Sequence, residues 1–167
     1  FSSGIKWMER EETIFTNTFT GSDDVLVQNF VPQKGHIDSI QILLAISDGL
    51  PSIANWKLKI ELRGANSEVI QQAIVGESEF ENWDYYTFKV DKDVKTGEEY
   101  QLIFKQIEGG EAEKQKLWSS SMACFISPYE IEEYKGCTFN GEKINGNIEA
   151  IFNYSYYTWY PLIILWI

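Results

Sequence analysis

The sequence predicts an all-β fold, in which two antiparallel sheets pack as a jelly-roll sandwich. Apolar and polar residues alternate at every second position in many short segments, the pattern of strands that cover a core with one face. Polar and glycine-containing turns separate these segments at intervals of roughly 8–12 residues, the spacing typical of sandwiches and barrels. No segment of about ten or more residues keeps the apolar stripe of a helix. Together these observations predict about nine or ten short strands and no long helix.

The clearest predicted strand ends at Arg63. At every second position from Trp56 to Leu62 the residue is apolar, whereas the intervening positions and Arg63 are charged. Because successive side chains of a strand point to opposite faces, one face of this strand meets a core and the other meets water. The segment from Ile40 to Ile46 has apolar residues on both faces, which predicts a central strand that is covered on both sides.

Two further alternating segments, 85–90 and 100–105, are joined by a polar connection that contains Gly97. We therefore predict that they form an antiparallel hairpin with a long connection. One helical turn is expected at most, over residues 128–134. Additional strands are predicted at 13–19, 25–31, 68–75, 117–126 and 148–154.

The chain is long enough for one domain with a substantial core. A chain of 167 residues buries roughly two-thirds of the surface that it exposes when unfolded. We expect a single sandwich domain over residues 1–158 and a separate role for residues 159–167. Tyr156, Tyr157 and Trp159 precede an apolar run, as aromatic residues do at a membrane interface, but the run is shorter than the ~20 residues that a membrane span needs. Residues 159–167 are thus either a terminal strand or the start of a membrane-proximal segment, and we expect the chain to be part of a longer, membrane-anchored protein.

The charge balance excludes one class of partner. With 14 basic and 25 acidic residues, the formal net charge is −11. An acidic surface repels the phosphate backbone of nucleic acids, so we expect no nucleic-acid partner. Anionic lipid is disfavoured in the same way, whereas neutral ligands and proteins remain as candidate partners.

The sequence contains no recognisable catalytic motif. Its single histidine, His36, follows a glycine in a predicted turn, where we expect it to be solvated. A solvated turn histidine does not suit a serine protease triad, and a histidine-rich zinc site needs further histidines. Paired carboxylates are abundant, but solvated acidic turns explain them more economically than a glycosidase site does. We expect no enzymatic activity.

The spacing of Cys124 and Cys137 is not that of metal ligands. A location outside the cell would permit a disulfide between them, but we favour two buried thiols. We expect no cofactor. Asp23 and Asp24 could hold a structural calcium ion, but a turn is the simpler interpretation of this pair.

Carbohydrate binding is the function for which the sequence offers candidate residues. Aromatic rings stack on the apolar faces of sugar rings, and neighbouring amide or charged groups bind the hydroxyls. Strand alternation places Trp83 and Tyr85 on the face opposite Tyr86 and Phe88, and therefore outside if the latter pair points inward. The alternative is that the tryptophans cap the open ends of a sandwich. The candidate platforms are Trp83, Tyr85 and Trp118, and the candidate hydrogen-bonding residues are Arg63, Asn82 and Asn140.

Seven segments between residues 27 and 152, in a fixed order, carry a resemblance to a known family. Each segment alone is weak evidence, because such patterns are common in strands. Their order over most of the chain is what carries the resemblance. The segments are Val27-Gln28-Asn29-Phe30, Ile37 to Ile42, Trp56 to Arg63, Trp83 to Phe88, Gly97 to Leu102, Asn140-Gly141-Glu142 and Gly146 to Phe152.

This series resembles the jelly-roll accessory domains of bacterial membrane-associated and cell-surface proteins, some of them linked to surface-polysaccharide synthesis, which have a galactose-binding-like fold. The resemblance implies a location outside the cytoplasm and a carbohydrate or an envelope protein as partner. The leading expectation is a non-catalytic module that recognises carbohydrate or another envelope component. The alternative is a structural or protein-interaction domain of a larger membrane protein.

Overall fold

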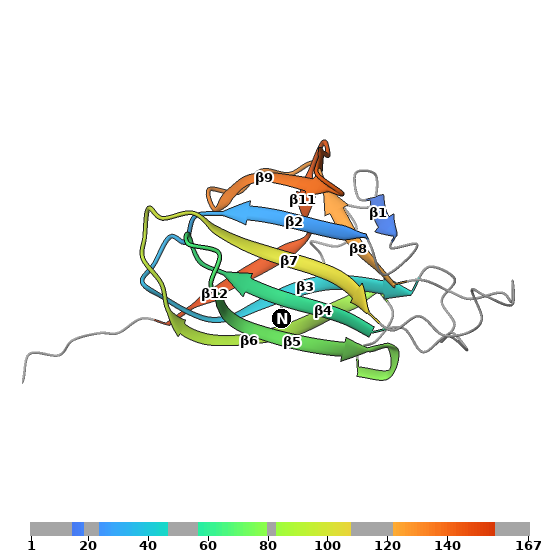
Figure 1. The fold of residues 1–167 in the computed structure, drawn as a ribbon, viewed down its shortest axis with the longest axis horizontal. Helices are drawn as coiled ribbons and strands as arrows, with labels where there is room; N and C mark the ends of the chain where they lie inside the picture. The colour runs from blue at the N-terminus through green and yellow to red at the C-terminus, as the bar shows by residue number, and fades with distance from the viewer. Residues whose placement is uncertain (1–14, 19–23, 47–56, 80–82, 108–121, 156–167) are drawn as a thin grey trace, which may run out of the picture.

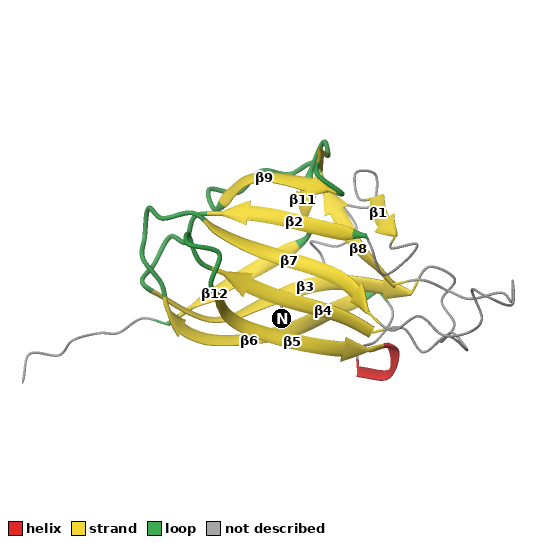
Figure 2. Ribbon diagram, viewed as in Figure 1, coloured by secondary structure: helices red, strands yellow, loops and turns green. Residues whose placement is uncertain are grey.

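The chain forms an all-β structure of antiparallel strands. In the computed structural model, the one helical segment among the described residues is the 3₁₀ turn η1 (Glu77–Glu79) (Figure 2). Among the residues that the structure describes, no helix is long and apolar enough to span a membrane. The expected segment 159–167 lies outside the described residues, which are 15–18, 24–46, 57–79, 83–107 and 122–155.

The described strands form two sheets of six strands each, here called sheet A and sheet B (Figure 1). Sheet A contains β1 (Phe15–Thr18), β3 (His36–Ile46), β6 (Asp84–Asp93), β8 (Met122–Ser127), β11 (Asn147–Ile148) and β12 (Ala150–Tyr154). Sheet B contains β2 (Val25–Phe30), β4 (Lys57–Arg63), β5 (Val69–Gly76), β7 (Tyr100–Ile107), β9 (Tyr134–Phe139) and β10 (Glu142–Lys143).

Strand β3 organises sheet A. It pairs with β6 along one edge, and with β12 and then β8 along the other. Strands β1 and β11 both pair with β8. In sheet B the order is β10-β9-β2-β7-β4-β5. Figure 1 views sheet B with the strands of sheet A passing behind it.

The two sheets share one apolar core. Ile40, Ile42 and Leu44 of β3 belong to the same buried cluster as residues of β4, and all are fully buried. The alternation seen between Trp56 and Leu62 therefore correctly predicted an inward face, which in the structure consists of Leu58, Ile60 and Leu62.

Strand β3 is covered on both faces, as its sequence predicted. Leu43 and Ala45 lie on the face opposite the shared core and are only 1% and 2% exposed. Tyr85 of β6 packs against both of them. This second, smaller apolar cluster lies on the outer face of sheet A.

The predicted hairpin between the segments 85–90 and 100–105 is wrong. Strand β6 pairs with β3 in sheet A, whereas β7 pairs with β2 and β4 in sheet B. Phe88 and Phe104, one from each strand, are fully buried in the shared core. Alternation identifies the buried face of a strand but does not specify its hydrogen-bonded neighbour, so the connection crosses between the sheets instead of closing a hairpin.

Strand β9 was not predicted, because a bulge interrupts its alternation. Gln28 of β2 pairs with Cys137 and Phe30 pairs with Tyr134, so two residues of β9 face one residue of β2. Tyr134 and Cys137 are both buried although they are three positions apart. Gly136, with a φ of +109°, accommodates the bulge.

Candidate functional site

The outer face of sheet A is the surface of β6, β3 and β12 that points away from the shared core. The strand register places side chains of the three strands in rows across this face. Gln41 of β3 lies between Thr87 and Ile151, and Ser39 lies between Lys89 and Asn153. Tyr85 is paired with Leu43 at one end of these rows.

Trp83 precedes β6 at the end of this face next to Tyr85. Its side chain is 61% exposed, the largest exposure among the described large apolar residues. Its backbone N–H donates a hydrogen bond to the Leu44 carbonyl, at 3.2 Å, although its φ is +65°. A bulky residue rarely adopts a positive φ, which costs on the order of 1 kcal/mol or more. The residue is therefore held in a strained conformation with its ring at the surface.

Packing and a hydrogen bond hold the side chain of Tyr85 in place. Its ring covers the apolar pair Leu43 and Ala45. Its hydroxyl donates a hydrogen bond to Glu149 Oε1, at 3.2 Å. Glu149 is only 6% exposed, and its carbonyl accepts a hydrogen bond from the Leu43 N–H. Tyr85 is thus a half-buried ring whose polar end is held by a carboxylate.

The middle of the face is polar. Asn153 Nδ2 lies 3.2 Å from Ser39 Oγ and 3.3 Å from Gln41 Oε1, so the three side chains form a hydrogen-bonded group across β3 and β12. Thr87 and Lys89 of β6 are exposed on the other side of β3. Hydroxyl, amide and ammonium groups therefore follow the ring of Tyr85 along the same face.

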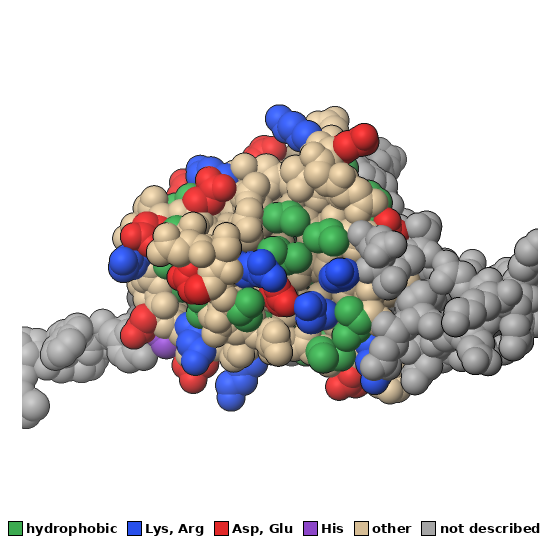
Figure 3. All heavy atoms as spheres, in the orientation of Figure 1, with side chains coloured by type: hydrophobic (Ala, Val, Ile, Leu, Met, Phe, Trp, Pro, Cys, Tyr) green, Lys and Arg blue, Asp and Glu red, His purple; other side chains and the backbone are tan. Residues whose placement is uncertain are grey.

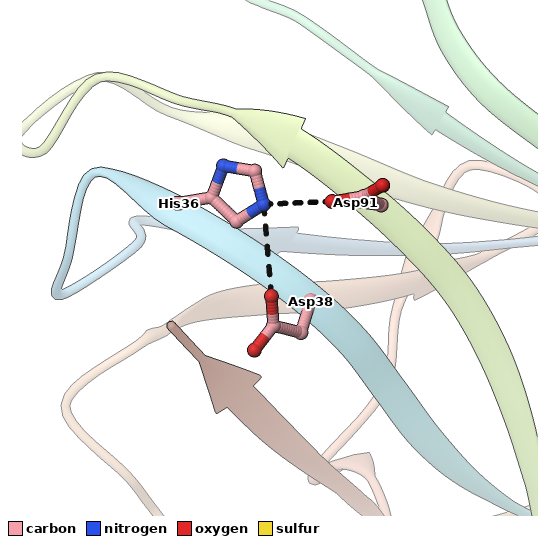
Figure 4. A group of neighbouring side chains, drawn as sticks. All are labelled: His36, Asp38 and Asp91. Atoms are coloured by element: carbon pink, nitrogen blue, oxygen red, sulfur yellow. Dashed lines mark hydrogen bonds and ion pairs between the residues drawn. The ribbon is translucent and has the colours of Figure 1, made fainter. Parts of the chain in front are cut away.

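A cluster of one histidine and three aspartates lies at the far end of β3 and β6, and Figure 4 shows the histidine with two of the aspartates, Asp38 and Asp91. His36 Nδ1 is 2.6 Å from Asp93 Oδ1. His36 Nε2 is 3.0 Å from Asp91 Oδ1 and 3.6 Å from Asp38 Oδ1. The hydroxyl of Ser155 donates a hydrogen bond to Asp38 Oδ1. We call these four residues, His36, Asp38, Asp91 and Asp93, the histidine cluster.

The expectation that His36 is solvated is wrong. His36 begins β3, and its side chain is only 8% exposed because its backbone pairing with Asp93 places it beneath the aspartates. The hydrogen bond to Asp93 is the largest influence on the pKa of His36 and raises it. Partial burial lowers this pKa, but the hydrogen bond to Asp91 raises it further, so that the pKa lies above its usual value.

Two of the predicted site residues lie on sheet B instead. Arg63 ends β4, where its Nε and Nη2 atoms lie 2.8 and 2.7 Å from Glu61 Oε2. Asn140 occupies the β9–β10 turn, with its Oδ1 accepting from the Val25 N–H and its Nδ2 donating to Asp24 Oδ1, both at 2.8 Å. Trp83 and Tyr85 are two positions apart at the start of β6 in sheet A, whereas Arg63 and Asn140 belong to sheet B.

The remaining predicted residues are only partly described. Asn82 and Trp118 lie outside the described residues, as does Asp23. Asp24 accepts the hydrogen bond from Asn140, which is consistent with a turn. Cys124 and Cys137 are both buried, and neither forms a disulfide.

Sequence reasoning missed the polar residues that accompany the two rings. Alternation alone places Thr87 and Lys89 on the same face as Tyr85. The contributions of Gln41, Asn153 and Glu149 depend on which strands are neighbours, and alternation carries no information about this.

Comparisons with known proteins found no matching family model, no matching curated protein and no matching solved structure.

Proposed function

We propose that this chain is a non-catalytic module that binds carbohydrate on the outer face of sheet A. The observation that carries the proposal is that Trp83, which is 61% exposed, lies directly before β6 and two positions from Tyr85, at one end of a sheet face that bears hydroxyl and amide groups. An exposed indole offers a flat apolar surface for a sugar ring. Thr87, Gln41 and Asn153 offer donors and acceptors for sugar hydroxyls along the same face.

The number of carboxyl groups on this face supports carbohydrate binding rather than hydrolysis. Glycoside hydrolysis needs two carboxyl groups about 5–10 Å apart across the scissile bond. Among the described residues of the face from Tyr85 to Asn153, Glu149 is the one carboxylate, and its Oε1 accepts the hydrogen bond from Tyr85. A single engaged carboxylate supports a module without hydrolytic activity.

The proposal includes a jelly-roll fold and a location outside the cytoplasm, as the family resemblance implies. Its structural support is that the chain passes between the sheets at several connections, such as β2 to β3, β3 to β4 and β6 to β7. Protease treatment of intact cells that express the parent protein tests the location. Cleavage within this domain supports it, and full protection of a domain that is cleaved after lysis contradicts it.

A glycan array followed by calorimetric titration tests the carbohydrate proposal. The wild-type chain should bind at least one class of glycan, and Trp83→Ala should lower the affinity roughly tenfold or more, equivalent to about 1.4 kcal/mol. Tyr129→Ala is the matched control, because Tyr129 is 41% exposed but lies in the connection from β8 to β9. Absence of glycan binding, or equal binding by Trp83→Ala, contradicts the proposal.

A second candidate, protein interaction, is favoured by the outer face of sheet B. Alternation along β4 and β7 places Lys57, Lys59, Arg63 and Lys105 on this face, with Glu61 between them. Figure 3 shows basic and hydrophobic side chains interspersed over these strands. In a chain of net charge −11, a locally basic face with half-exposed Ile74 is complementary to an acidic protein surface.

Titration with poly-glutamate at low and at physiological salt tests this second candidate. Lys105→Glu should weaken binding roughly tenfold or more, because it reverses one of the four positive charges of this face. Lys89→Glu makes the same charge change on sheet A and should bind as the wild type does. The docking role is contradicted if the wild type, Lys105→Glu and Lys89→Glu bind poly-glutamate equally, or if the wild type does not bind it.

A further inference from the structure

We propose that the histidine cluster binds one divalent transition-metal ion of the zinc type, with His36, Asp38 and Asp91 as its ligands. This inference is independent of carbohydrate binding, because it rests on a different group of residues at the opposite end of β3 and β6. Its basis is that one nitrogen of His36 and one carboxylate oxygen from each of Asp38 and Asp91 lie close together (Figure 4).

The two distances from the imidazole nitrogen to the carboxylate oxygens suit a zinc ion. One imidazole nitrogen and two carboxylate oxygens all lie within 4.8 Å of one another. Ligand bonds of about 2.0–2.1 Å in a tetrahedral arrangement place the ligand atoms about 3.3 Å apart. The distances from His36 Nε2 to Asp91 Oδ1 and Asp38 Oδ1, 3.0 and 3.6 Å, lie on either side of this value.

The strand register explains how the four side chains meet. His36 and Asp38 come from the start of β3, and Asp91 and Asp93 come from the end of β6, where a φ of +48° at Asp91 interrupts the regular strand. His36 pairs directly with Asp93, and the register shift between Ile37 and Ser39 lies beside Asp38. The pattern His-x-Asp on one strand thus meets Asp-x-Asp on its antiparallel neighbour.

Asp93 prepares the imidazole for metal binding. With Nδ1 only 2.6 Å from Asp93 Oδ1, the ring donates its Nδ1–H to this carboxylate. In the neutral ring, Nε2 then carries the lone pair and faces Asp38 and Asp91. A carboxylate behind the imidazole is the usual outer partner of a metal-binding histidine. Ser155 orients Asp38 in a similar way by hydrogen bonding to its carboxylate.

The surrounding charge also favours a cation. Three carboxylates surround one imidazole, which can carry at most one positive charge. The mixed nitrogen and oxygen ligands favour zinc or cobalt over calcium or magnesium, which prefer oxygen ligands in larger number. Asp38 and Asp91 are 48% and 68% exposed, so the fourth coordination position faces solvent.

The test is calorimetric titration of the untagged, chelator-treated chain with Zn²⁺, together with the visible absorption of Co²⁺. One ion should bind per chain, and Asp91→Asn should weaken binding tenfold or more. Asp93→Asn should also weaken binding, by about 10- to 100-fold, although Asp93 is not a ligand. Glu132→Gln, which removes one exposed acid in the connection from β8 to β9, is the charge-matched control and should bind as the wild type does.

The competing arrangement is an imidazolium in which a second proton occupies Nε2 and bonds to Asp91. Nitrogen NMR of His36 distinguishes the two, because Zn²⁺ should displace the Nε2 proton. Absence of Co²⁺ absorption at millimolar metal, or equal Zn²⁺ affinity in Asp91→Asn, overturns the proposal. Trp83→Ala should retain Zn²⁺ binding, so failure of the carbohydrate proposal would leave this result intact.

Discussion

Gln28 is a polar residue that is fully buried between the two sheets. Its Nε2 donates to Asn147 Oδ1 at 3.0 Å and to the Gly136 carbonyl at 3.1 Å. Its Oε1 accepts from the Ile148 N–H at 3.0 Å. Because Gln28 lies in sheet B and Ile148 in sheet A, these bonds join the sheets through the interior.

Replacing Gln28 should therefore destabilise the fold strongly. Gln28→Leu removes the acceptor of the Ile148 N–H and the donor to Asn147 Oδ1, at a cost of about 3 kcal/mol in the free energy of unfolding. Gln72→Leu, at an exposed position of β5, should change it by less than about 0.5 kcal/mol. Urea unfolding measures both. Equal effects of the two substitutions would show that the buried hydrogen bonds do not stabilise the junction.

The two cysteines should be chemically inert in the folded chain. Burial is the main cause that raises the pKa of Cys124, and it raises the pKa of Cys137 to about 12. Since the thiolate is the reactive form, a thiol reagent at pH 8 should label neither residue until denaturant is added. Immediate labelling of either cysteine in the native chain contradicts the buried placement of both thiols.

Glu61 should make stability depend on pH in the acid range. Its carboxylate is covered by Lys59 and Arg63, whose nitrogens lie within 2.8 Å. Burial is the largest single influence and raises the pKa of Glu61, but hydrogen bonds and charge from Lys59 and Arg63 together outweigh it, so the pKa is lowered. A lowered pKa means that the folded chain binds this proton less readily than the unfolded chain does.

The stabilisation by Glu61 is therefore fully present above the unfolded pKa, near 4.5, and is lost as the pH falls through the lower folded pKa. Glu61→Gln should be less stable than the wild type at neutral pH, and the difference should shrink below the unfolded pKa. Thermal unfolding across this range measures it. A difference that stays constant with pH argues against an ionised Glu61 as the source.

At the scale of elements, the β9–β10 hairpin depends on its two-residue turn. Asn140 and Gly141 have φ values of +51° and +81°, as in the turns that match the twist of a hairpin. Asparagine and glycine tolerate this conformation better than other residues do. Asn140 also bonds to the start of β2, so the turn holds the edge of sheet B against its neighbour.

Gly141→Ala should lower the free energy of unfolding by about 1 kcal/mol, because a β-carbon at positive φ meets the backbone. No other atom crowds this position, so the loss reports backbone strain alone. Gly35→Ala, where φ is not positive and the nearest contact is 3.8 Å away, is the matched control and should be nearly neutral. A neutral Gly141→Ala would exclude strain at the turn.

The elements also show what alternation can predict. It identified the buried faces of β3 and β4 correctly, since a side-chain period of two follows directly from strand geometry. It misassigned β6 and β7 as a hairpin, and it missed β9 at the bulge. Edge pairing and bulges depend on contacts between distant segments, which a local pattern does not contain.

At the scale of the whole molecule, the two outer faces differ in chemistry. Sheet A presents Tyr85 followed by hydroxyl and amide groups and Lys89. Sheet B presents several basic side chains together with apolar ones (Figure 3). The sequence predicted the pair Trp83 and Tyr85 but not the neighbours that β3 and β12 contribute. It also gave no sign that His36 would meet three aspartates, because two of them come from a strand 55 and 57 positions away.

The most direct test of the central claim is a nitrogen–proton NMR titration of the chain with the oligosaccharide that binds best on the array. The account predicts that the shifted amides cluster in β6 near Trp83 and Tyr85, and in the parts of β3 and β12 around Gln41 and Asn153. Shifts centred on β4 and β7, or no shifts at saturating oligosaccharide, would contradict a carbohydrate site on the outer face of sheet A.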